Sequence, residues 1–147
     1  MAFEQIQFKE TVANVDFEKV AQILNDTGLS DADAAVQQAT FEHSDGVLFA
    51  YDGDQLIACS RVLSDGISQA AIYNVAIAAP YQHSGLGTKM IARLVARYHQ
   101  CNIILYTHPK TLTWYEDLGF ERMNTGLAIF QKDHVDWMRH EGFIKQK

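Results

Sequence analysis

The clearest hydrophobic pattern in the chain lies in residues 74–98. A short apolar run with β-branched residues covers 74–79 and predicts a buried strand. Pro80 follows at its end and has no N–H to donate to the ladder of a sheet. After the loop sequence QHSGLG, apolar residues recur at helical spacing: Met90, Ile91, Leu94, Val95 and Tyr98. The pattern therefore predicts a strand, a loop with two glycines and an amphipathic helix from Thr88.

Similar patterns predict the remaining elements. Strands are expected where β-branched and aromatic residues alternate or run together, at residues 3–11, 46–51, 55–63, 69–79, 102–107, 120–123 and 127–131. Helices are expected at residues 17–27, capped by Asp16, 31–43, capped by Ser30, 88–100 and 110–118, with a last short helix within 133–147. The strand at 102–107 follows a strand and a crossover helix, so it should lie parallel to the strand that ends at residue 79.

The loop between the central strand and its helix has the features of an anion site. The first N–H groups of a helix have no partner within the helix, and they lie at the positive end of its dipole. Gly85 and Gly87 carry no Cβ and let the backbone approach a bulky anion. The loop is therefore predicted to bind a phosphate or a pyrophosphate. The dinucleotide fingerprint is excluded because Met90 stands where its third glycine belongs, and the chain has no P-loop sequence.

Three short sequences resemble the GNAT N-acetyltransferase superfamily. Residues 82–87 have the spacing Q-x-x-G-x-G of that family's acetyl-CoA loop, and VAIAAPYQ before them is similar to its strand motif. TWYEDLGF at residues 113–120 is similar to the family's F-Y-x-x-L-G-F segment. The motifs stand in the family's order and at its usual separation. The resemblance covers about residues 3–131.

The resemblance implies a fold and an activity. The fold is α/β (α+β), the GNAT acyl-CoA N-acyltransferase fold, with a central mixed, mostly antiparallel sheet of about seven strands, splayed between strands four and five and flanked by about four helices. One domain is expected over residues 1–147, with 132–147 as a C-terminal extension. The activity is direct transfer of the acetyl group of acetyl-CoA to a primary amine of a small molecule or a protein lysine. Many relatives dimerise, so a homodimer is expected.

The resemblance also assigns residues to the site. The pyrophosphate of CoA would lie on the backbone amides of Gln82, His83, Ser84, Gly85, Leu86, Gly87 and Thr88. The pantetheine arm would pair with backbone groups of Val75 and Ile77, one of which would also stabilise the oxyanion through its N–H. Tyr115 matches the family's general acid, and a phenol near pKa 10 can protonate an alkyl thiolate of similar basicity. The alternative is that Tyr115 only packs beside Trp114 and Phe120.

Three positions depart from the family pattern. His108 stands where many members have an asparagine that touches CoA, and a histidine can still donate a hydrogen bond there. Ala71 and Asn74 stand where relatives have an acidic general base. The amine would therefore lose its proton to water, through a chain that involves Tyr73 or Asn74, or would arrive in its neutral form.

The composition of the chain restricts the expected ligands and the expected cellular compartment. The net charge is −6 and no block of basic residues occurs, which argues against a nucleic-acid surface. No apolar stretch reaches the length of a membrane span, the first ten residues do not read as a secretory signal, and the two cysteines read as free thiols. The six histidines show no metal-ligand spacing, so no metal is expected. These observations predict a cytoplasmic protein.

Two other classes of function stay open from the sequence. The missing base is compatible with a regulatory module that binds CoA without catalysis. The apolar residues of the tail, 133–147, are compatible with a protein-interaction domain that keeps the fold but binds no CoA. Turnover with a panel of amines separates an enzyme from the first alternative, and CoA binding separates it from the second.

Overall fold

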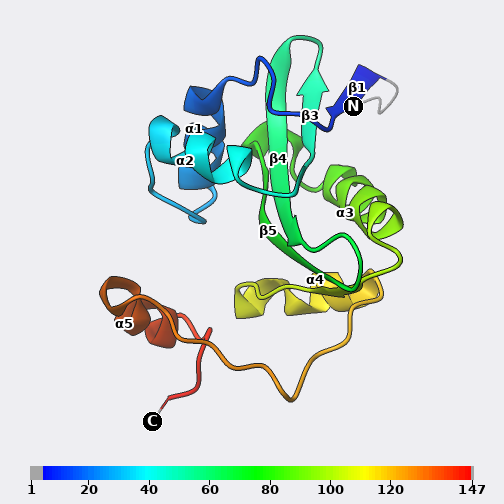
Figure 1. The fold of residues 1–147 in the computed structure, drawn as a ribbon. Helices are drawn as coiled ribbons and strands as arrows, with labels where there is room; N and C mark the ends of the chain where they lie inside the picture. The colour runs from blue at the N-terminus through cyan, green and yellow to red at the C-terminus, as the bar shows by residue number, and fades with distance from the viewer. Residues whose placement is uncertain (1–4, 147) are drawn as a thin grey trace. The chain divides into compact units, whose positions relative to one another are not determined.

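The computed structural model divides the chain into two compact units, Met1–Leu105 and Tyr106–Lys147, and describes residues 5–146 (Figure 1). The first unit contains β1 Ile6–Lys9, α1 Phe17–Asp26, α2 Ala34–Glu42, β2 Gly46–Val47, β3 Phe49–Asp52, β4 Gln55–Ser64, β5 Gln69–Ile77, the 3-10 turn η2 Ala79–Tyr81, α3 Leu86–Arg97 and β6 Asn102–Ile104. The second contains the 3-10 turn η3 Pro109–Thr111, α4 Leu112–Asp117 and α5 Lys132–His140.

The first unit is built on one open sheet. Its strand order is β1-β3-β4-β5-β6, and β2 pairs with β4 beside β3. All neighbours are antiparallel except β5 and β6, which are parallel. The predicted mixed, mostly antiparallel α/β fold is therefore confirmed, with six strands and five α-helices in residues 5–146. The predicted parallel pairing of the 102–107 strand is also confirmed, although that strand ends at Ile104.

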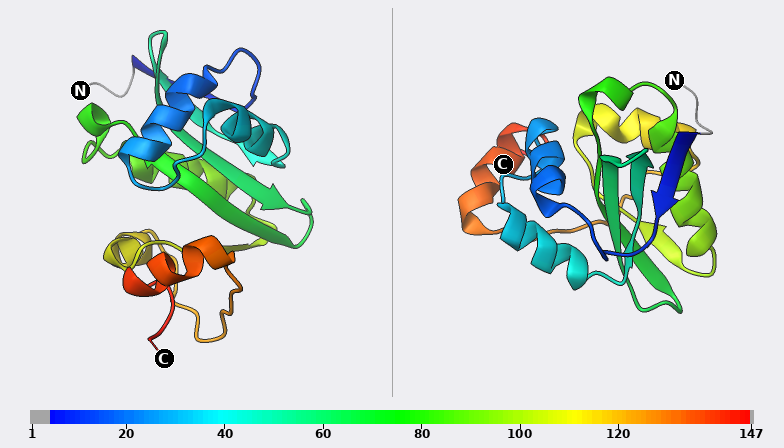
Figure 2. Two further views of the ribbon diagram at one scale, coloured as in Figure 1. Left: turned by 90° about the vertical axis from the view of Figure 1, so that its left-hand side faces the viewer. Right: turned by 90° about the horizontal axis from the view of Figure 1, so that it is seen from above.

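Helices cover both faces of this sheet. Figures 1 and 2 show α1 and α2 on one face and α3 on the other. Beneath α1 and α2, the rings of Phe17, Phe41 and Phe49 pack with centroids 5.6–6.3 Å apart. Phe41 and Phe49 are almost fully buried. This aromatic cluster joins both helices to β3 and provides much of the core on that side.

Local capping explains where the first two helices begin. Asp16 caps α1, because its carboxylate accepts from the N–H groups of Glu18 and Lys19. The second helix was expected to start after Ser30, but Asp33 is its cap and accepts from Val36 N at 2.9 Å. The Ser30 hydroxyl instead accepts from Ala32 N and the Gln37 side chain. The prediction that Ser30 caps this helix was wrong. Ser30 and Asp33 can both act as caps, and Asp33 is the one that directly precedes the first turn.

The turn between β4 and β5 is organised by one carboxylate. Asp65 accepts hydrogen bonds from the backbone N–H groups of Ile67, Ser68 and Gln69 and from the Ser68 hydroxyl. These bonds favour the charged form, so they hold the pKa of the Asp65 carboxyl well below its usual range. The turn fixes the start of β5, which pairs with β4 from Ala70 to Ile77.

The second unit differs from the prediction in residues 118–131. Strands were expected at 120–123 and 127–131, and neither forms, so residues 106–146 contain helices and irregular backbone only. Leu127 and Ile129 are fully exposed, at 101% and 102% of their reference areas. An apolar, β-prone sequence becomes a strand only with a neighbour to pair with, and no strand within residues 5–146 pairs with either segment. The predicted tail helix does form, as α5.

The first strand is shorter than predicted. The first strand was predicted for residues 3–11, and β1 covers Ile6–Lys9, while residues 3 and 4 lie outside the described part.

Within residues 5–146, every helix is too short or too polar to cross a bilayer.

Candidate functional site

The open edge of β5 lies on the side where β6 leaves the sheet. β6 pairs with β5 only at Gln69–Ala71, so the rest of β5 has no strand on that side within residues 5–146. Ala78 N donates to Ile57 O, toward β4. Because backbone groups alternate in direction along an antiparallel strand, the N–H groups of Val75 and Ile77 point to the open side. A peptide-like ligand can add there as an extra strand.

A β-bulge at Asn74 shapes this part of β5. Cys59 pairs with Ala76 and Arg61 with Tyr73, so β5 has one extra residue between these pairs. Asn74 takes that place with φ of 56°, in the left-handed region. Its side-chain oxygen accepts from Arg61 Nε at 2.6 Å, and the Arg61 guanidinium lies 4.9 Å from the Tyr73 ring centre. The Asn74 oxygen is thus engaged by a cation, which makes it a poor relay for a substrate proton.

The loop after β5 is more tightly turned than its sequence indicated. The strand ends at Ile77, and Pro80 lies within the 3-10 turn η2 that follows it. The helix α3 begins at Leu86, two residues before the expected start at Thr88, with Gly85 as its N-cap at φ of 88°. Gly85 therefore takes a conformation that suits glycine and is strained for other residues. His83 also has a positive φ, of 60°.

The N-terminus of α3 presents a row of free backbone donors. The hydrogen bonds found in residues 5–146 include none from the backbone N–H groups of His83, Ser84, Gly85, Leu86, Gly87 and Thr88. The helix bonds begin at Lys89 N, which donates to Gly85 O at 3.2 Å. No acidic residue occupies the first turn of α3. These donors and the helix dipole together favour an anion.

Gln82 stands apart from the other predicted amides. Its backbone N–H donates to Ala79 O at 3.2 Å, so it is already used within the turn. Its side chain donates to Ile77 O at 2.9 Å, on the open side of β5. The Ser84 hydroxyl likewise donates back to Tyr81 O at 2.6 Å. These polar side chains bond to the loop itself, and the backbone from His83 onward is left for a ligand.

Tyr115 lies in α4 of the second unit and is well packed. It is 8% exposed, and its ring contacts those of Trp114 and Phe120 at 4.7 and 5.6 Å between centroids. Burial raises the pKa of Tyr115 to about 12. The hydroxyl therefore keeps its proton at neutral pH, as a general acid must, but it is a weaker acid than a free phenol. The packing contacts are those that the alternative interpretation expected, and they leave its acid role a prediction.

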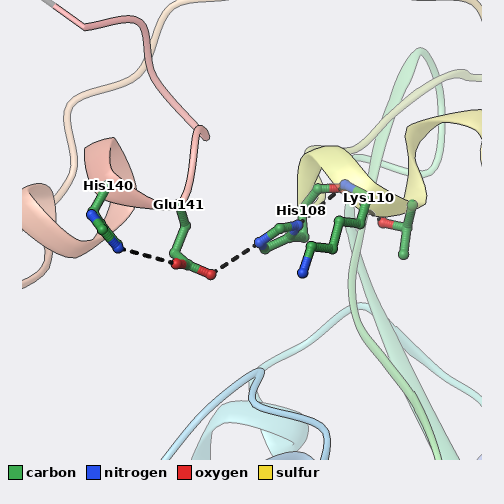
Figure 3. Close-up of polar contacts among 5 residues, drawn as sticks. His108, Lys110, His140 and Glu141 are labelled. Atoms are coloured by element: carbon green, nitrogen blue, oxygen red, sulfur yellow. Dashed lines mark hydrogen bonds and ion pairs between the residues drawn. The ribbon is translucent and has the colours of Figure 1, made fainter.

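His108 is held by two hydrogen bonds inside the second unit. Its Nε2 lies 3.1 Å from Glu141 Oε1, and its Nδ1 accepts from Lys110 N at 3.1 Å (Figure 3). The neutral ring must then carry its proton on Nε2 and donate it to the carboxylate. The ring also contacts Phe143 at 5.4 Å. A contact of His108 with CoA stays a prediction and would have to replace one of these bonds.

Metal and thiol chemistry depend on the grouping and burial of the histidine, cysteine and acidic side chains. Within residues 5–146, His, Cys, Asp and Glu side chains form no group of three that could hold a metal ion. Cys59 is fully buried, and this burial raises the pKa of its thiol to about 12, so it is not a nucleophile at neutral pH. Cys101 is partly buried and lies 3.9 Å from the Ser64 hydroxyl.

Comparison with known families covers the region that contains these residues. The profile of the acetyltransferase (GNAT) domain matches residues 43–122, which include β5, the loop, α3 and Tyr115. The chain belongs to the GNAT acetyltransferase family. Its fold is similar to that of a Deinococcus radiodurans protein described as an acetyltransferase, with a TM-score of 0.78 over 92% of this chain and 93% of that one, at 22% identity.

Two curated plant proteins are similar in sequence. GCN5-related N-acetyltransferase 1, chloroplastic, of Arabidopsis thaliana is 27% identical over 117 residues, which are 76% of this chain and 59% of the relative. Serotonin N-acetyltransferase 2, chloroplastic, of Oryza sativa subsp. japonica is 34% identical over 67 residues, 44% of this chain and 34% of the relative. The matched residues thus span less than two thirds of the length of either relative.

Sequence reasoning missed two contacts around the site. The sequence placed Arg61 in a strand and indicated no role for it. Its hydrogen bond to the Asn74 side chain depends on the β-bulge at Asn74. Tyr81 was read only as part of a motif, and its hydroxyl donates to Asp52 at 2.5 Å. The only hint in the sequence was the position of Tyr81 directly before the glycine loop, and nothing local indicated its partner.

Proposed function

We propose that this protein is an N-acetyltransferase that transfers the acetyl group of acetyl-CoA directly to a primary amine. The observation that carries the proposal is the run of free backbone donors from His83 to Thr88, next to the open edge of β5. The first feature suits a diphosphate and the second suits a peptide-like pantetheine arm. Both lie in the first unit, and together they match the two chemically different parts of CoA.

The reaction assigns a task to each group. The amine nitrogen attacks the thioester carbon, and the developing oxyanion is stabilised by the backbone N–H of Ile77 or Val75. The C–S bond then breaks, and Tyr115 protonates the departing thiolate. The amine proton goes to water, because Ala71 is apolar and the Asn74 oxygen is bonded to Arg61. His108 stays a candidate contact for CoA. No metal takes part in this scheme.

The acceptor is proposed to be a primary amine, either on a small molecule or on a protein lysine. The name of the Oryza relative identifies serotonin, a small arylalkylamine, as that protein's substrate, and the name of a similarly related Glycine max protein identifies histones, so both classes of acceptor are proposed. A panel of such amines, with a lysine peptide included, would rank the two classes by kcat/KM. Binding of acetyl-CoA without turnover of any amine would favour a regulatory module.

Gly85→Glu tests the anion site. The substitution places a negative charge and a strained side chain at the N-cap of α3, so acetyl-CoA binding should fall by about a hundredfold or more. Isothermal calorimetry measures the dissociation constant.

Gly28→Glu is the matched control, because Gly28 also has a positive φ, of 77°, with open space around it, and lies at the end of α1. It should bind acetyl-CoA as the wild type does. Wild-type protein that does not bind acetyl-CoA at all would remove the proposed function and leave only the fold.

A further inference from the structure

We propose that Asp52 and Tyr81 form a latch that holds the diphosphate-binding loop in its binding shape. Tyr81 is the last residue of η2, directly before the loop, and Asp52 is the last residue of β3. The Tyr81 hydroxyl donates to Asp52 Oδ2 at 2.5 Å. The inference rests on the proposed function, because it concerns how this loop binds acetyl-CoA.

Asp52 is a firm anchor. Its backbone pairs with Ile6 of β1 on one side and with Gln55 of β4 on the other, so it is fixed at the end of a three-strand ladder. An O–H to carboxylate bond is charge-assisted and stronger than one between neutral groups. The same bond is the main reason that the pKa of Tyr81 is raised, so the phenol keeps the proton that it donates.

The latch continues into the loop through short bonds. Tyr81 O accepts from the Ser84 hydroxyl at 2.6 Å, and Tyr81 N donates to Ala78 O at 2.9 Å. Ser84 directly precedes Gly85, the N-cap of α3. A connected path therefore runs from the β3–β4 hairpin through Tyr81 and Ser84 to the first free amides.

The loop needs such support because its backbone is not in a preferred conformation. His83 has φ of 60°, which is unfavourable for a residue with a Cβ and persists only when neighbouring structure holds it. Amides that must point at a diphosphate bind best when they are already oriented, since ordering them on binding costs affinity. Without the latch, the loop has to be ordered by the ligand.

This mechanism predicts a ligand-specific loss. Tyr81→Phe removes one hydrogen bond to a charged group, and the dissociation constant for acetyl-CoA should rise about tenfold. Acetyl-pantetheine keeps the thioester arm and lacks the diphosphate, so its dissociation constant should stay within about twofold of the wild-type value. Calorimetry measures the first ligand and NMR titration measures the second.

A double-mutant cycle tests the pairing. Asp52→Ala should reproduce the loss caused by Tyr81→Phe, and the double variant should lose nothing more, because the two residues act through one bond. Asp52→Asn keeps an acceptor oxygen and should retain most of the affinity. Tyr51→Phe is the control: it removes a hydroxyl from the neighbouring residue of β3, outside the latch, and should bind acetyl-CoA normally.

The results distinguish a failure of the latch from a failure of the proposed function. If wild-type protein binds acetyl-CoA and Tyr81→Phe binds it equally well, the latch is disproved and the function stands. If Tyr81→Phe raises the dissociation constants of both ligands equally, the latch is also disproved. The same holds if the loss in free energy of unfolding is as large as the loss in free energy of binding, because the bond is then structural. If the wild type binds no acetyl-CoA, both proposals fail together.

Discussion

At the scale of the residue, burial and catalysis make different demands on the hydroxyl of Tyr115. Its ring lies among Trp114 and Phe120, and desolvation raises its pKa to about 12. A proton held this firmly is retained until a strong base arrives. An alkyl thiolate is a weaker base than this tyrosinate, because its conjugate acid has a pKa well below 12, so the raised pKa of Tyr115 makes the proton transfer uphill. The acid role therefore requires that bound acetyl-CoA changes the surroundings of the hydroxyl, and it stays a prediction.

Removing this hydroxyl tests the acid role. Tyr115→Phe should lower kcat by about a hundredfold or more, because the leaving group then depends on water for its proton. The ring and its packing are kept, so the dissociation constant of acetyl-CoA and the thermal unfolding midpoint should change little. Steady-state kinetics at saturating substrates, together with calorimetry, measures both quantities.

The control for this variant is Trp114→Phe, which changes the neighbouring ring without touching the phenol. A kcat that is unchanged in Tyr115→Phe, in an enzyme whose chemical step is shown to be rate-limiting, would remove Tyr115 from the role of acid. The packing interpretation would then stand alone.

At the scale of the element, the turn between β4 and β5 links stability to pH. The hydrogen bonds to Asp65 hold its folded-state pKa below that of the unfolded chain. A group whose pKa is lowered by folding stabilises the native state above its unfolded pKa, near 4, and loses that contribution as the pH falls toward its folded value. The turn should therefore weaken on acidification below about pH 4.

Asp65→Asn isolates this effect. At pH 7 the variant should unfold at a lower temperature than the wild type, because the amide accepts fewer of the turn's hydrogen bonds and carries no charge. Between pH 5 and pH 2 the difference should shrink, since the carboxyl of the unfolded chain takes up a proton below about pH 4 while that of the folded protein stays charged. Thermal unfolding followed by circular dichroism measures it. A difference that is constant over this range would show that the charge of Asp65 is irrelevant.

The elements that were predicted correctly are those whose signal is local. Strands, the hairpin turn and the parallel strand after α3 follow from periodicity, turn residues and handedness. The strands expected at 120–123 and 127–131 failed, because forming a strand depends on a partner elsewhere in the chain. The start of α2 failed because Ser30 and Asp33 are both good caps, and local sequence does not rank them.

The features of the candidate site also differ in how local their sequence signals are. The glycine loop was recognised, and its helix was predicted to start two residues from its observed start at Leu86, because the required residues are adjacent in sequence. The latch joins residues 29 positions apart, and the bond from His108 to Glu141 spans 33 positions. Such pairs depend on the fold that brings them together. The sequence shows which groups are present, and only the structure shows which of them already have partners.

At the scale of the whole molecule, the acetyltransferase profile covers parts of both units. It runs from residue 43 to residue 122 and so extends past Leu105, where the first unit ends. The donors for the diphosphate belong to the first unit and Tyr115 to the second. The homodimer, the cytoplasmic setting and the single domain over residues 1–147 stay predictions, and sedimentation analysis would test the first of them.

The exposed residues Leu127 and Ile129 have a consequence for how the chain is digested. A protease binds its substrate as an extended strand, and this segment has no helix or strand to unfold and carries two fully exposed apolar residues. Brief treatment with chymotrypsin should therefore cut first within residues 120–131, and mass spectrometry of the fragments would locate the bond. First cuts within β4 or α1 would contradict this. Survival of the segment would mean that it is paired in solution, as its sequence led us to expect.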